Sequence, residues 1–491
     1  MPSETLQLPH RAWPNAGTRG RVRQRIKAAG EELAIVRDPL RIAMFVLTIL
    51  NVSRVHQHYP ILGKFRPALL LVVASVGYAY LNPRFLTKAN VLKLWPMRVI
   101  AILAVLSCCS AAFGISLGRS ASFILDTYVK VVVYAFLVAL SIRNVRDLYT
   151  LVWAYVISCG ILTYMSLFVF GISRRGSYVT RLNDLYTYDS NDLGVIMMIG
   201  LALTLLLLVV SRGWRRWVVV MILLGIAATI ARSGSRGGFL GFVAAAAGAL
   251  VLVNSVPASR RMGLLAAAIV ALLIGAPPGY WKQMSTILEP KADYNYSSLD
   301  GRRALIQRGI YYMEKYPIFG LGIDNFARAE CTISPKLERL RINGPMRCTP
   351  PHNSYLQAAT ELGVPGIVLW VSLVFGGIFA PLRLRRRLPQ AWRRGTDAER
   401  FIYGATSFFP VAMIGFAVTS FFVSFAWVDS LYLQSALLSG LYVAARVQLE
   451  EERGSGAGDA LLDRSSPSAG WRVVRSARSA LVKPRVRRGR G

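Results

Sequence analysis

The sequence predicts an all-α polytopic membrane protein with about 12 transmembrane helices and one large extramembrane loop. Of the 491 residues, 54% are hydrophobic and only 17% are charged, whereas soluble domains carry about 25% charged residues. The apolar residues are collected in runs, and about 12 runs of roughly 20 residues, the length that crosses a bilayer, would use half of the chain. This composition excludes a secreted soluble enzyme, a disordered chain and a disulfide scaffold.

The predicted spans follow one another along most of the chain. Most of them approach or exceed the length of a membrane-spanning helix, and the first is the weakest because Arg54 ends it early. Residues 1–38 before it are polar and basic, without the apolar region of a cleavable signal, so we expect an uncleaved anchor. The spans are residues 42–53, 67–81, 99–117, 121–141, 148–171, 193–210, 216–231, 237–253, 262–278, 355–380, 403–424 and 428–445.

The basic residues predict the orientation, because Lys and Arg are retained on the cytoplasmic side of a membrane. With the N-terminus inside, every short cytoplasmic loop carries Lys or Arg, while the outer turn at 424–429 carries neither. Both termini are then cytoplasmic. Most of the formal charge of +33 lies on that side, where it would face the anionic headgroups of membrane lipids. This distribution leaves little support for nucleic-acid binding.

The expected organisation is a basic cytoplasmic tail, a bundle with an outer loop, and a second basic tail. We expect one amphipathic helix in the loop, at about 301–316, because Asp300 is a good N-cap and Pro317 ends the helix. Its stripe of Ile306, Ile310 and Met313 would lie on the membrane surface. The parts are 1–38 (N-tail), 39–279 (spans one to nine), 280–354 (outer loop), 355–446 (spans ten to twelve) and 447–491 (a disordered C-tail).

The five cysteines divide between the spans and the outer loop. Cys108, Cys109 and Cys159 fall inside spans, where they are expected to pack in the core. Cys331 and Cys348 lie in the outer loop, in a compartment that permits disulfides. We predict that these two pair, with two free thiols as the alternative.

Three polar clusters lie at the outer rim of the predicted bundle. The second cluster has the clearest chemistry, because Ser and Gly lead into a helix whose free N–H groups face outward between two arginines, Arg232 and Arg236. Such a helix start favours a phosphate or diphosphate; the alternative is a tight turn whose arginines reach lipid headgroups. The clusters are Arg174, Arg175 and Arg181 with residues 188–192, then residues 231–238, then residues 350–354.

His352 is the titratable residue of the third cluster. It follows two prolines and closes the outer loop, so it could accept a proton from a sugar hydroxyl near neutral pH. The alternative is a helix cap or a headgroup contact. Two further charges lie within a span: Asp126 and Lys130 are four residues apart and can neutralise each other. Intramembrane charges suggest function, but a structural ion pair is an equal alternative, and Glu361 is a similar case.

No metal or cofactor site is expected. His56 and His58 have no further ligands at a matching spacing. Asp189 and Asp192 could hold a cation, but Asn191 and Asp192 are more simply the N-cap of a span. The sequence contains no phosphate-binding loop or dinucleotide-binding turn. ATP is therefore not expected as an energy source.

Five segments, taken in order, resemble the O-antigen ligase and O-antigen polymerase family. One departure is that the motif usually written Asp-Pro-Asn reads Asp189-Ser190-Asn191 here. The resemblance covers about 180–380 strongly. The segments are residues 189–194, 235–238, 300–302, 316–326 and 351–363.

The resemblance implies a metal-independent, inverting glycosyltransferase of the GT-C-like membrane type, acting on the periplasmic side of the bacterial inner membrane. The donor would be a glycan on undecaprenyl diphosphate. The acceptor would be lipid A–core for a ligase, or another lipid-linked repeat for a polymerase, in the synthesis of lipopolysaccharide or exopolysaccharide. No cofactor is implied. A transporter or flippase of lipid-linked saccharides is the alternative, but transporters show internal repeats and none is evident here.

The family's motifs assign roles to residues of this chain. A departing diphosphate needs fixed cations, and we expect Arg181, Arg236 and Arg302 to supply them. His352 would orient or deprotonate the acceptor hydroxyl. The predicted catalytic residues are thus His352, Arg236 and Arg302, and the predicted substrate-binding residues are Arg181, Arg232, Arg303, Asn353, Asp189 and Asn191.

Overall fold

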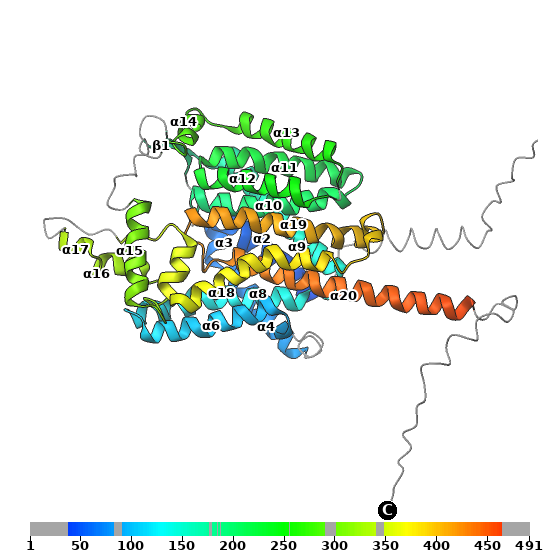
Figure 1. Cartoon of the computed structure of the whole chain (residues 1–491), viewed down its shortest axis with the longest axis horizontal. Helices are drawn as coiled ribbons and strands as arrows, with labels where there is room; N and C mark the ends of the chain where they lie inside the picture. Colours follow the sequence, from blue (N-terminus) through cyan, green and yellow to red (C-terminus); the bar gives the residue numbers. More distant parts are fainter. Residues whose placement is uncertain are drawn as a thin grey trace, which may run out of the picture. The chain divides into compact units, whose positions relative to one another are not determined.

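The structure is a computed structural model that describes residues 38–82, 91–175, 179–183, 185–186, 188–254, 256–289, 301–339 and 348–463. Within these residues the chain is almost entirely helical. The exception is a short antiparallel hairpin, β1 (Ile172–Arg175) and β2 (Val179–Leu182), in which Arg181 pairs with Ser173. The described part of the chain is therefore all-α in character, as predicted (Figure 1).

The helices follow the predicted apolar runs. In the first half they are α2 (Pro39–Ser53), α3 (Pro60–Lys64), α4 (Pro67–Leu81), α6 (Trp95–Phe113), α7 (Leu117–Phe123), α8 (Val129–Ser141), α9 (Val145–Tyr164), α10 (Ser190–Val210) and α11 (Trp214–Ser233). In the second half they are α12 (Arg236–Leu252), α13 (Ala258–Gly275), α14 (Tyr280–Ser285), α15 (Arg302–Lys315), α16 (Phe326–Thr332), α17 (Lys336–Arg339), α18 (Ser354–Arg385), α19 (Asp397–Thr419) and α20 (Asp429–Asp463).

Every predicted span overlaps a helix. Among the described residues, nine helical stretches are long and apolar enough to cross a membrane. The three other predicted spans correspond to the shorter helices α2 and α12 and to α20. The chain is thus an all-α protein with multiple membrane-spanning helices.

The centre of the bundle is formed by α10 and α19, which pack against each other and are mostly buried. A helix that is apolar on all sides needs neighbours on all sides, and α10 has α9, α11, α12 and α19 around it (Figure 1). Close contact at the start of α10 requires glycine: a Cβ on Gly194 would lie 3.0 Å from the Cα of Gly238 in α12. The N-terminal turns of α10 and α12 therefore touch.

Helix α18 is broken in its third turn. Gly363 has φ 69° and ψ −167°, a backbone conformation that side chains disfavour. The break receives the turn at 317–322: Leu321 N donates to Thr360 O at 2.8 Å, and Val364 N donates to Pro317 O at 2.8 Å. Two of the family-like segments, 316–326 and 351–363, thus form one structural unit that anchors the outer loop to α18.

Replacing Gly363 by Ala is expected to destabilise the protein by about 1–3 kcal/mol, because a strained backbone of this kind costs that much. A Cβ there would lie 2.5 Å from the carbonyl oxygen of Ile318. Thermal unfolding in detergent measures the loss. The matched control is Gly77→Ala in α4, where nothing lies within 4 Å of a new Cβ. Equal unfolding temperatures for the two variants would contradict this interpretation of the break.

The predicted loop helix exists as α15, and it packs on the loop through a face other than the stripe predicted to lie on the membrane. Asp300 lies outside the described residues, and Gly301 occupies the N-cap position. Leu305 and Tyr312 are buried against Leu321, Phe326 and Leu356. The predicted apolar stripe stays on the outside: Ile306 is 41% exposed and Ile310 is 50% exposed. The stripe of Ile306 and Ile310 therefore takes no part in the packing of α15 on the core of the outer loop.

The C-terminal segment from Arg446 forms a separate compact unit. The described part of it is helical as far as Asp463, where disorder from residue 447 onward was predicted. An i,i+4 pair contributes to this helix: Arg446 Nε lies 2.8 Å from Glu450 Oε1. Residues 464–491, like the N-tail before Asp38, lie outside the described residues.

Candidate functional site

The first and second polar clusters meet at the start of α12. Ser235 is the N-cap of this helix, and its Oγ accepts from Gly238 N at 3.0 Å. The same hydroxyl donates to Asn191 Oδ1 of α10 at 2.8 Å, in a buried position. Asn191 and Ser235 belong to two segments of the family-like pattern, so this bond joins the loops that carry those segments.

Asp189 is held in the same frame. It is the N-cap of α10, and its Oδ1 accepts from Asn191 N at 2.6 Å and from Asp192 N at 2.8 Å. Asp192 completes the capping box by accepting from Asp189 N at 3.0 Å. The predicted cap of this helix therefore exists, but Asp189 and not Asn191 is the N-cap residue, with Asp192 closing the capping box. The role of Asp189 and Asn191 in binding substrate stays a prediction.

Arg236 is the first residue of α12 and is half-buried. Its Nη1 donates to Thr286 Oγ1 at 3.0 Å, and that hydroxyl donates to Gln283 O at 2.7 Å. Gln283 in turn donates from Nε2 to Gly234 O at 2.7 Å. The end of α14 therefore braces the turn that carries Arg236, so the guanidinium is held in place before any ligand arrives.

The side chain of Phe422 lies between the starts of α12 and α15. The guanidinium carbon of Arg302, the first residue of α15, lies 5.0 Å from the ring centroid of Phe422. On the α12 side, a Cβ on Gly237 would lie 2.7 Å from Phe422 Cβ. The starts of α12 and α15 therefore reach the same point, although they are far apart in the sequence.

His352 is attached to the same segment. Its backbone N–H donates to Ser424 Oγ at 2.9 Å, two residues after Phe422. Ser354 Oγ donates to Val423 O at 2.8 Å and accepts from Phe425 N at 2.9 Å. Asn353 caps α18 through its Oδ1. His352 has φ 47°, a left-handed conformation uncommon outside glycine. Residues 422–425 thus contact the His352 loop, the start of α12 at Gly237, and Arg302.

The remaining predicted cations lie on elements next to the start of α12 or at the protein surface. Arg181 on β2 and Arg232 in the last turn of α11 each have a buried Nε atom without a hydrogen-bond partner among the described residues. β2 contacts both α11 and α14, so these two arginines belong to neighbouring elements. Arg303 is exposed. Arg174 and Arg175 lie on β1.

Asp126 and Lys130 do not form the expected ion pair within the described part of the chain. Asp126 Oδ2 instead accepts from Ser122 Oγ at 3.0 Å. The chain forms a π-helical turn at Ile124–Tyr128, and this wider turn shifts residues that are four apart out of their usual stacking. Both side chains line a cavity of about 500 Å³.

This cavity lies beside the His352 loop. Pro350, Pro351 and Ser424 form part of its wall. The wall carries charges of both signs together with hydrogen-bonding groups, a composition suited to a polar ligand. The charged and strongly polar lining residues are Asn51, Arg54, His56, Gln57, Asp126, Lys130, Asp324, Gln357, Glu361 and Asp429.

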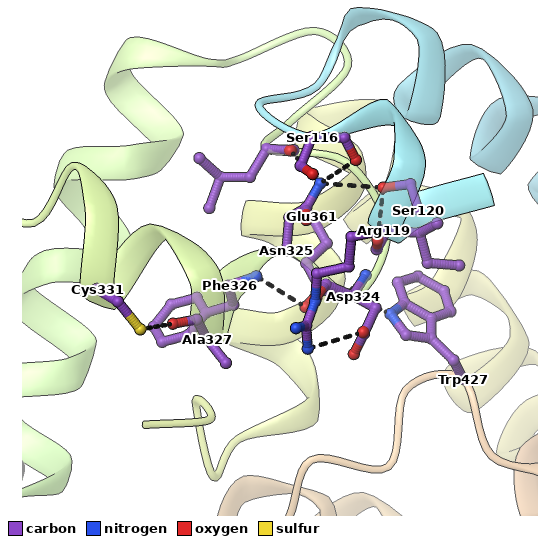
Figure 2. Close-up of polar contacts among 12 residues, drawn as sticks. Ser116, Arg119, Ser120, Asp324, Asn325, Phe326, Ala327, Cys331, Glu361 and Trp427 are labelled. Atoms are coloured by element: carbon purple, nitrogen blue, oxygen red, sulfur yellow. Dashed lines mark hydrogen bonds and ion pairs between the residues drawn. The ribbon is translucent and has the colours of Figure 1, made fainter. Parts of the chain in front are cut away.

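Glu361 organises the wall shared by this cavity and the outer loop (Figure 2). Its Oε2 accepts from Asp324 N at 2.9 Å and from Trp427 Nε1 at 2.6 Å, and its Oε1 accepts from Phe326 N at 3.3 Å. A buried carboxylate that satisfies several N–H groups holds their segments together. The sequence marked Glu361 as an intramembrane charge but not these partners, because none of them is near it along the chain.

Helix α7 holds the same segment of the outer loop from another side (Figure 2). Asn325 Nδ2 donates to Ser120 Oγ at 3.0 Å, and Arg119 Nη2 lies 3.0 Å from Asp324 Oδ2. Burial raises the pKa of Asp324, and Arg119 lowers it in part. Sequence reasoning missed Arg119, Ser120 and Asn325; the signal available was the position of Asn325 inside the 316–326 segment.

Cys331 and Cys348 come together in the outer loop, with Cα atoms 5.1 Å apart and a disulfide between them. In unreduced, denatured protein we expect maleimide to label only Cys108, Cys109 and Cys159, and reduction to expose two more thiols. Mass spectrometry of the labelled protein counts the adducts. Five adducts without reduction would mean that the bond is absent in the protein.

Among the described residues, no group of three or more His, Cys, Asp or Glu side chains is placed to hold a metal ion. The cations near Phe422 are guanidinium groups, which bind phosphate oxygens directly through paired N–H donors. The described site therefore offers charge without a metal cluster.

Comparison with known proteins bears on residues 221–371. The profile of the O-antigen ligase family matches this stretch, which contains four of the five segments noted in the sequence and leaves out only 189–194. No curated protein matches the chain significantly. The family's role is in polysaccharide biosynthesis, and its members are glycosyltransferase-like ligases. Residues 221–371, which carry Arg236, Arg302 and His352, are therefore similar to the O-antigen ligase family.

Proposed function

We propose that this protein is a glycosyltransferase that moves a glycan from undecaprenyl diphosphate to a saccharide acceptor on the periplasmic face of the bacterial inner membrane. One observation supports this above the others: three separate elements meet the short segment around Phe422 and Ser424. They meet it through Gly237, the residue after Arg236, through the guanidinium of Arg302, and through the backbone N–H of His352. In the proposed topology about 12 spans form a GT-C-like bundle with both termini in the cytoplasm.

The proposed donor site lies on the side of α12 and α15. As the bond between the sugar and the lipid diphosphate breaks, the electron pair leaves with the diphosphate, whose growing charge needs donors already in position. Arg236 is braced by Thr286, and Arg302 lies over Phe422. Arg181 and Arg232, with their unpartnered Nε atoms, would take further oxygens of the diphosphate. These cations do the work that a metal performs in other transferases.

The proposed acceptor site is the cavity of about 500 Å³ on the other side of Pro350 and Pro351. The acceptor hydroxyl would attack the anomeric carbon from the face opposite to the leaving diphosphate, so the configuration is inverted. Its proton passes to the imidazole of His352, the neighbour of Pro351. The mixed charges of the cavity suit a saccharide, which presents donors and acceptors together.

The test is reconstitution of the full chain with undecaprenyl-diphosphate repeat units, with and without lipid A–core. A core-linked product would identify a ligase, and longer lipid-linked chains would identify a polymerase. If neither product forms while the lipid-linked donor crosses the bilayer, the protein is a transporter and the proposal fails.

We also expect EDTA to leave the transfer rate unchanged, because guanidinium groups replace the metal in the proposed mechanism. The rate is measured in the same reconstituted system before and after chelation. A metal-dependent transferase treated in parallel serves as the control for effective chelation. Loss of transfer that added Mg²⁺ or Mn²⁺ restores would show that a metal participates.

A further inference from the structure

A second cavity, of about 630 Å³, lies at the other end of the helices that carry the site. It is enclosed by α10, α11, α12, α13 and α19, which lie side by side in Figure 1. Part of its wall is aliphatic, with Leu201, Leu205 and Leu265 among the lining residues. Its mouth is basic, and no carboxylate lies among the described residues that line it. The lining arginines are Arg212, Arg216, Arg260, Arg261, Arg393 and Arg400.

We propose that this cavity binds an anionic phospholipid, with its phosphate headgroup among the arginines and an acyl chain along the aliphatic wall.

The positions of the arginines support an anionic ligand. Arg216 lies in the first turn of α11, and Arg260 and Arg261 lie in the first turn of α13. A helix N-terminus carries partial positive charge, so a cation there is unfavourable unless an anion offsets it. Basic residues are retained on the cytoplasmic side of a membrane, which accounts for arginines at this end of the helices. It does not account for six arginines lining one cavity without a carboxylate among its described lining residues.

Some of these arginines are already held by the protein, and others are available. Arg212 and Arg400 share Asp397, at 2.8 and 3.0 Å, so their charge exceeds that of their partner. Arg216 and Arg260 are exposed and have no side-chain partner within the part of the chain that the structure describes. They are the groups that remain for a phosphate.

A buried polar atom is a second, independent observation. Ser211 lines the cavity and is only 7% exposed, yet its Oγ has no hydrogen-bond partner among the described residues. Buried hydroxyls are normally satisfied, so this one indicates a polar group of a ligand. Gly263 of α13 also lines the cavity, and a Cβ there would meet nothing within 4 Å. This leaves room for an acyl chain beside α13.

The test is native mass spectrometry of the full chain in detergent, titrated with phosphatidylglycerol or with phosphatidylcholine. We expect wild type to retain phosphatidylglycerol at concentrations where phosphatidylcholine is lost. The double variant Arg216→Gln/Arg260→Gln should bind phosphatidylglycerol about thirtyfold more weakly, from the loss of two charges facing an anionic headgroup. The matched control, Arg386→Gln/Arg387→Gln, removes two exposed charges outside the cavity and should bind as wild type does.

A second variant tests the chain-binding part without changing charge. Gly263→Leu should fill the cavity and weaken phosphatidylglycerol binding, whereas Gly77→Leu, also in open space, should not. Inorganic phosphate at millimolar concentration should fail to displace the lipid, because it cannot use the aliphatic wall. Equal retention of the two lipids by wild type, unchanged binding in Arg216→Gln/Arg260→Gln, or full displacement by phosphate would each overturn the proposal. None of these outcomes depends on transferase activity.

Discussion

Replacing Arg236 by Ala is expected to lower transfer about 10²- to 10³-fold, the usual cost of removing one donor that stabilises charge in a transition state. The protein should still fold and insert, because the turn around Arg236 is held by Ser235, Asn191 and Gln283 rather than by the guanidinium. The measurement is the turnover of lipid-linked donor in the reconstituted system, with thermal unfolding recorded for the same samples.

Two further variants sharpen this test. Arg236→Lys keeps the charge but not the paired N–H donors. If both donors hold the diphosphate, this variant should also lose turnover of the lipid-linked donor. Arg328→Ala is the matched control, because Arg328 is an exposed arginine of the outer loop that the mechanism does not use. Wild-type turnover in Arg236→Ala would refute the proposed mechanism.

The second large effect is expected at His352. His352→Asn should reduce kcat about 10²- to 10⁴-fold, the usual contribution of a general base. Asn is chosen because it tolerates the left-handed backbone at this position and keeps the N–H that donates to Ser424. The loss should appear in kcat, while the KM for the donor stays near its wild-type value, because the cations that bind the diphosphate are untouched.

The control for His352 is His58→Asn. His58 is an exposed histidine after α2, and its replacement should change neither kcat nor KM. If His352→Asn raised the KM for the acceptor while leaving kcat unchanged, His352 would be an orienting group and not the base. If it changed neither, the imidazole would have no part in the reaction.

Much of the architecture was predictable because it depends on local chemistry. A run of apolar residues must become a helix in a bilayer, where no water satisfies the backbone, and every predicted span overlaps a helix. The start of α12 was also predictable, since Ser235 is a strong N-cap residue three positions before Gly238. The existence of α15 followed from Pro317 after its end and from good helix formers within it.

Other features depended on contacts between distant residues. The stripe of Ile306 and Ile310 on α15, predicted to lie on the membrane surface, stays exposed. The opposite, buried face with Leu305 and Tyr312 was not predicted, because its partners lie elsewhere in the chain. The Asp126–Lys130 pair was expected from regular helical spacing, and a π-helical turn removed that spacing. The partners of Glu361 lie more than 30 positions from it.

Local patterns were enough to predict which segments are helical, that the cations and the histidine stand at helix starts, and which family the central segments resemble. Periodicity, capping and hydropathy act over a few residues, so they can be recognised without a fold. Long-range packing, by contrast, brings Gly237, the neighbour of Arg236, together with Arg302 and the backbone of His352 at the segment around Phe422 and Ser424. That convergence results from packing among α12, α15, α18 and α19, because close packing depends on the shapes of residues that are remote in the chain.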